Sequence, residues 1–67
     1  MEPGDFVTYI PNNENGIVKS ISPEGNIFVV YKCGGDWKHY YNYSAALTRK
    51  KDLKLGWYCP DEKLSRP

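Results

Sequence analysis

The segment "GIVKSISPEGNIFVVYK" (Gly16–Lys32) decides the fold, because it reads as two strands joined by a tight turn. Its first part, Gly16–Ser22, has the β-branched composition of a strand. The turn "PEGN" (Pro23–Asn26) has proline early and glycine late, which suits a hairpin. In Ile27–Lys32 both the odd and the even positions are apolar, which is typical of a central strand covered on both faces. The segment therefore predicts a hairpin whose second strand lies inside a sheet.

The flanking sequence continues this pattern of short strands and turns. Asp5–Ile10 is rich in β-branched and aromatic residues and stops at a proline, and a loop with an Asn-Gly turn signal follows. Asp52–Trp57 suits a single turn of 3-10 helix, and no segment has helical periodicity over ten residues. Several short strands in a chain of 67 residues predict a small all-β barrel that is closed or nearly closed. Closure would also remove unpaired strand edges.

The composition fits one small domain that relies on aromatic side chains. A chain of this length buries only about 60% of its unfolded surface, and small domains compensate with disulfides, metals, aromatic residues or partners. Two Trp, six Tyr and two Phe are present. We expect the domain to occupy residues 1–57 and a polar tail with two prolines to occupy residues 58–67.

Charge is balanced overall but uneven along the chain. The net charge is +1. Residues 1–31 carry four acidic residues against one lysine, whereas residues 32–54 carry six basic residues against two acidic ones. This asymmetry fits a face for an acidic partner, although scattered surface lysines give the same pattern.

The two cysteines, Cys33 and Cys59, do not make a disulfide scaffold. No apolar run is long enough to span a membrane or to serve as a secretory signal. We therefore expect a cytoplasmic protein with reduced thiols, no membrane partner, no small-molecule substrate and no cofactor. The oligomeric state stays open.

The order "GDFVTYI … GIVKSI … NIFVVYKCGGD … ALTRKKDLKLGW" resembles SH3-like barrels of the Tudor and KOW type. The resemblance covers residues 4–57 and implies a five-stranded barrel with a short 3-10 turn near its C-terminal end. It also implies a bulge in the second strand. The matching positions are Gly16, Val18 and Ile21 in the second strand, Val29, Tyr31 and Gly34 in the third, and Asp52 and Leu53 in the final turn. The part "W-x-x-Y … ALT … DL … GW" looks like small phage and mobile-element proteins.

An insert at Asp36–Ser44 departs from that resemblance and, with the basic turn after it, forms the predicted contact face. The candidate binding residues are Trp37, Lys38, His39, Tyr40, Tyr41, Tyr43, Arg49, Lys50 and Lys51. One interpretation is that several of these rings, with Trp57, cover the open end of the barrel. The other is that one of Tyr40 and Tyr41 is exposed, because consecutive side chains of an extended segment point to opposite sides.

Catalytic and metal chemistry are both poorly supported by the residues present. Cys33 and His39 lie six residues apart, and no orienting third group is evident. Cys33, His39 and Cys59, with Asp36, lack the closely spaced ligand pair of a structural zinc site. We therefore expect a non-enzymatic chain with no metal centre.

An exposed tyrosine beside basic residues has three uses. It can stack a nucleobase while lysines contact phosphates, anchor a protein interface, or join an aromatic cage for a methylated cation with Asp36. The resemblance to phage proteins favours an accessory binding module that docks on a host protein or ribonucleoprotein, with a CRISPR-type defence nuclease as one target. The alternative is direct binding of RNA or single-stranded DNA through the aromatic and basic residues.

Overall fold

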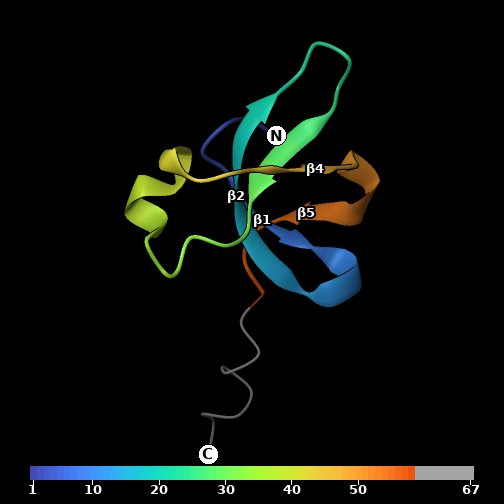
Figure 1. The fold of residues 1–67 in the computed structure, drawn as a ribbon. Helices are drawn as coiled ribbons and strands as arrows, with labels where there is room; N and C mark the ends of the chain where they lie inside the picture. Colours follow the sequence, from blue (N-terminus) through green and yellow to red (C-terminus); the bar gives the residue numbers. More distant parts are fainter. Residues whose placement is uncertain (59–67) are drawn as a thin grey trace, which may run out of the picture.

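The computed structural model describes residues 1–58 and shows one five-stranded antiparallel sheet with the strand order β4-β3-β2-β1-β5 (Figure 1). The all-β prediction is therefore confirmed. Three short 3-10 helices, η1 to η3, lie between the strands of the described part. The elements are β1 (Phe6–Tyr9), η1 (Ile10–Asn12), β2 (Glu14–Ile21), β3 (Ile27–Val30), η2 (Trp37–Asn42), β4 (Ala46–Thr48), η3 (Lys50–Asp52) and β5 (Leu53–Leu55).

The predicted hairpin is confirmed as β2 and β3, and its turn contains Gly25 at a φ of +93°. The expected bulge is present as a register shift between Val18 and Ser20. The predicted 3-10 turn at Asp52–Trp57 is wrong in position, because η3 ends at Asp52 and the chain continues as β5. Leu53 is drawn into the strand because its side chain is buried in the core and its backbone pairs with β1.

The expected closure of the barrel is not found within residues 1–58. The sheet ends at β4 on one side and at β5 on the other, and these two strands are not paired. Each of them has only three residues, and η3 separates them in the chain. Such short strands pair with β3 and β1 but extend no further, so the sheet stays open along the outer edge of β4.

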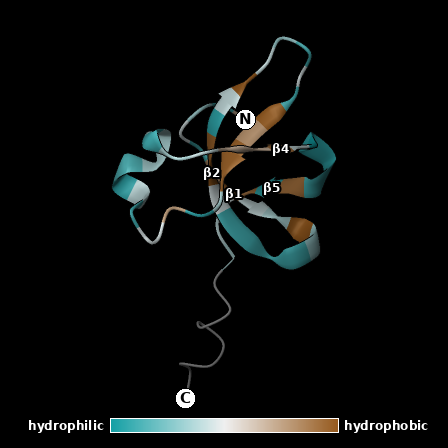
Figure 2. Cartoon of the chain, in the orientation of Figure 1, coloured by the Kyte–Doolittle hydropathy of each residue, from teal (hydrophilic) through white to brown (hydrophobic). Residues whose placement is uncertain are grey.

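The main core lies on one face of the sheet, which we call the inner face. It consists of Val7, Val18, Ile27, Val29 and Leu53, all buried. These residues come from four strands, and cross-strand partners such as Val18 and Val29 point to the same side. Figure 2 shows the apolar residues gathered where the strands cross, with hydrophilic residues on η2 and η3.

The opposite face, which we call the outer face, is also buried at its centre. Phe6, Ile17 and Val30 are neighbours across β1, β2 and β3. Ile17 and Val30 are almost completely buried, and so is the thiol of Cys33. The expectation that the third strand is covered on both faces is therefore confirmed for β3.

The chain beyond β5 returns to the start of β2. Asn15 Nδ2 donates a hydrogen bond to the Tyr58 carbonyl at 2.9 Å, and the Tyr58 amide donates to Asn15 Oδ1 at 2.8 Å. The remainder of the predicted tail, with Cys59, lies outside the described residues.

Candidate binding groove

Most of the insert forms η2, in which a kink at His39 separates two short 3-10 turns, so the extended form under which Tyr40 and Tyr41 would point to opposite sides is not adopted. Its geometry depends on the carboxylate of Asp36. Asp36 Oδ1 lies 3.0 Å from His39 Nδ1, and the Tyr43 hydroxyl donates to Asp36 Oδ2 at 3.0 Å. The hydrogen bond from His39, and to a smaller extent the one from Tyr43, lowers the pKa of Asp36. The same hydrogen bond to Asp36 raises the pKa of the Tyr43 phenol.

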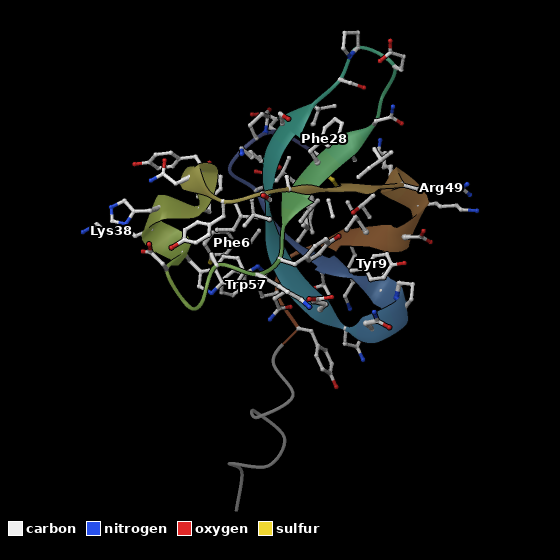
Figure 3. All side chains as sticks on the ribbon, in the orientation of Figure 1. Phe6, Tyr9, Phe28, Lys38, Arg49 and Trp57 are labelled. Atoms are coloured by element: carbon white, nitrogen blue, oxygen red, sulfur yellow. The ribbon has the colours of Figure 1, made fainter. Side chains whose placement is uncertain are left out.

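Aromatic stacking fastens η2 to the outer face. The Trp57 ring stacks on Phe6 at 4.5 Å between centroids and meets Trp37 at 4.9 Å. Figure 3 shows Phe6 and Trp57 side by side next to η2. Trp57 Nε1 donates to the Gly16 carbonyl at 2.8 Å. Trp37 of the insert therefore reaches the outer face of the sheet through Trp57, while Phe6 on that face stays half exposed.

A second tether holds the end of η2 to the sheet. Lys19 Nζ on β2 donates to the Tyr43 carbonyl at 2.8 Å. Trp37, Tyr40 and Tyr43 are all half-buried. These predicted binding residues are thus partly occupied in holding the insert in place.

The predicted basic and aromatic residues are divided between two sides of the molecule. Tyr41 is 56% exposed, and its ring contacts His39 and Tyr40 edge-on. Lys38 is exposed beside them on η2. Figure 3 places Lys38 and Arg49 at opposite sides of the molecule, and Lys50 and Lys51 follow Arg49 on η3. The insert and the basic turn therefore do not form one continuous face.

A hollow lies elsewhere, beside β4. It has a volume of about 450 Å³ and is lined by Tyr9, Glu14, Tyr31, Asp52 and the segment 46–49. A second hollow of about 330 Å³ shares Glu14, Tyr31 and Ala46 with the first and continues along residues 44–46, with Val29 and Lys32. We call these two connected hollows the β4 groove.

The strand register explains why these side chains meet. Tyr9 follows Val7 on β1 by two residues, and Tyr31 follows Val29 on β3, so both rings continue the inner face beyond the core. Glu14 is the cross-strand partner of Tyr9. The β4 groove is thus the inner face at the point where the core ends and the sheet fails to close.

Two tyrosine rings and two carboxylates set the character of the groove. The rings of Tyr9 and Tyr31 meet edge-on with centroids 6.1 Å apart. The Tyr31 hydroxyl and Thr48 Oγ1 form a hydrogen bond of 2.8 Å, which joins β3 to β4. Partial burial raises the pKa of Tyr31, and the negative charges of Glu14 and Asp52 raise this pKa further. Glu14 and Asp52 thus disfavour added negative charge beside the Tyr31 ring, while the basic residues Arg49 and Lys32 also line the groove.

None of the predicted binding residues except Arg49 lines this groove. The sequence did contain a signal for the β4 groove, because Tyr9 lies two residues after Val7 and Tyr31 lies two residues after Val29. This spacing places each tyrosine on the core side of the sheet. The proximity of Tyr9 to Tyr31, however, depends on the pairing of three strands, which the sequence alone does not specify.

Comparison of the chain with protein families, with curated proteins and with solved structures finds no match. Within residues 1–58, no three His, Cys, Asp or Glu side chains come together as a set of metal ligands. The described part also contains no helix with the length and apolar character needed to cross a membrane.

Proposed function

We propose that the chain is a non-catalytic binding module that docks an extended segment of a protein or nucleoprotein partner in the β4 groove. The observation that carries the proposal is the meeting of two tyrosine rings and two carboxylates at the open end of the inner face. Aromatic faces attract cations, and Glu14 and Asp52 add a negative field. The groove therefore suits a lysine or arginine side chain of the partner.

The sheet itself we infer to be of the SH3-like type. Support comes from the five strands, from the bulge in β2 and from the 3-10 helix just before β5. These are features that the resemblance to Tudor and KOW barrels implies. The open seam beside β4 is a departure from that pattern, and it is what leaves the groove accessible.

The origin of the partner rests on resemblance to phage proteins alone. An accessory role against a host protein, with a CRISPR-type nuclease as one target, stays a prediction. Direct binding of RNA or single-stranded DNA is the second candidate, and the exposed ring of Tyr41 beside Lys38 favours it. The nucleic-acid candidate is weakened by the placement of Arg49 and Lys38 at opposite sides of the molecule in Figure 3, because phosphate contacts and base stacking need one continuous surface.

The proposal can be tested with random linear hexapeptides displayed on phage and selected on the intact chain. Selected peptides are labelled, and their Kd is measured by fluorescence anisotropy. The double variant Glu14→Gln/Asp52→Asn should weaken binding about tenfold or more, because a close charge pair near a protein surface is worth a few kcal/mol. Glu24→Gln is the matched control, since Glu24 is exposed on the β2–β3 turn.

Circular dichroism would establish that both variants keep the fold. Peptides whose affinity is unchanged by the groove variant and lost on Tyr41→Ala would contradict the proposal. They would instead assign docking to the exposed ring on η2.

A further inference from the structure

We propose that the partner segment binds as an added β-strand along the outer edge of β4, with alternate side chains entering the two hollows of the groove. This inference rests on the proposed function and specifies how the partner is held. In this mode of recognition, main-chain hydrogen bonds supply affinity and pockets for alternate side chains supply specificity.

The first observation is that β4 presents a free edge. Within residues 1–58, β4 pairs with β3 alone and is the last strand of the sheet. A strand at a sheet edge carries backbone N–H and C=O groups that point away from the sheet and can pair with another chain. The groove follows this same strand, because its two hollows are lined by residues 44–49.

The second observation is that the residues of β4 carry no charge, proline or bulge. Natural sheets guard their edges with short strands, charged residues, proline or bulges, and of these β4 has only its short length. The three residues of β4 are Ala46, Leu47 and Thr48, and Leu47 is 61% exposed. The other edge strand, β5, carries the exposed Lys54 at its centre. The two edges therefore differ, and β4 is the one open to a further strand.

The dimensions of the groove agree with a short added strand. Residues 44–49 line the two hollows, and Ala46–Thr48 among them form the strand. Six residues in extended form span roughly 20 Å at about 3.3 Å per residue. A partner segment of about six residues would match this length. Its alternate side chains, about 7 Å apart, would project to the same side. Two neighbouring side chains of that set could then enter the two hollows.

The chemistry of the hollows specifies those two side chains. The first hollow combines the rings of Tyr9 and Tyr31 with the carboxylates of Glu14 and Asp52, which outnumber its one basic residue, Arg49, and this set fits a lysine or arginine. The second is lined by Ala45 and Ala46, with the buried Val29 behind them, which fits a small apolar residue. The segment we infer is thus extended, with a cationic residue and a small apolar residue two positions apart.

Backbone N-methylation of the selected hexapeptides tests this mode of binding. A strand added to β4 uses the N–H groups of every second residue. N-methylation of one set of alternate residues, odd or even, should therefore weaken binding at least tenfold. N-methylation of the other set should change the affinity less than threefold. Hydrogen exchange offers a second readout, because outward-pointing amides of β4 should exchange more slowly when the peptide is bound.

The outcomes separate the inference from the proposed function. Peptides that lose affinity on Glu14→Gln/Asp52→Asn but tolerate N-methylation at both parities would overturn strand addition and leave groove docking intact. A selection that yields no groove-dependent peptide would overturn the proposed function and the inference together.

Discussion

Gly16 on β2 allows the inner face to pack as it does, and replacing it with alanine should be markedly destabilising. Gly16 is the one glycine in the chain without a positive φ, so the demand for glycine is steric. A Cβ atom there would lie 2.6 Å from Val29 Cγ1, 2.8 Å from the Val30 carbonyl oxygen and 2.9 Å from Tyr31 Cδ1. Contacts this short do not occur for real Cβ atoms.

The crowding cannot be relieved by one flexible side chain. The Val30 carbonyl belongs to the backbone of β3, so it can move only if the β2–β3 pairing is disturbed. Forcing an extra methyl group into a close-packed site costs about 1–3 kcal/mol. The whole domain is stabilised by roughly 3–10 kcal/mol, at about 0.05–0.15 kcal/mol per residue. Gly16→Ala should therefore remove a large part of the free energy of unfolding.

Urea unfolding followed by tryptophan fluorescence measures this loss, and thermal unfolding should show the melting temperature falling by about 4–8 °C per kcal/mol. Ser20→Ala is the matched control, because Ser20 is exposed on the same strand and should change stability by less than about 0.5 kcal/mol. If Gly16→Ala is as stable as the control, the argument from close approach is refuted.

Three further predictions concern the insert and Trp57, the ring against which it packs. Trp57→Phe keeps an aromatic ring but loses the hydrogen bond to the Gly16 carbonyl, so urea unfolding should show a loss of about 1 kcal/mol. Because the folded-state pKa of Asp36 is lowered, its carboxylate stabilises the fold above the ordinary pKa of 3.8. The stability difference between wild type and Asp36→Asn should therefore shrink as the pH falls through that lowered pKa. A constant difference would contradict the role of the hydrogen bonds from His39 and Tyr43. Labelled single-stranded RNA should show no tight, salt-sensitive binding, and such binding abolished by Tyr41→Ala would instead support the nucleic-acid candidate.

The first three strands could be predicted because their signals are local. Proline and glycine mark the turn between β2 and β3, and β-branched residues fill the strands on either side. The failure of closure could not be predicted in this way. It depends on β4 and β5 each being only three residues long, and the length of a strand is set by the neighbour with which it pairs.

The insert illustrates a different limit. Its aromatic residues were recognised from the sequence, but the side that each ring faces depends on η2 being helical rather than extended. The hydrogen bonds from His39 and Tyr43 to Asp36 join residues three and seven apart, and they depend on the turns of η2 and on its kink at His39. The contact between Trp37 and Trp57 joins residues far apart in sequence.

The central claim is that the β4 groove recognises a cationic side chain of an extended segment. The most direct test compares a selected hexapeptide that contains arginine with the same peptide carrying citrulline, which keeps the shape and removes the charge. We predict that the arginine form binds the intact chain at least tenfold more tightly, and that this preference disappears in Glu14→Gln/Asp52→Asn. Equal affinity of the two forms for the wild-type chain would contradict the claim.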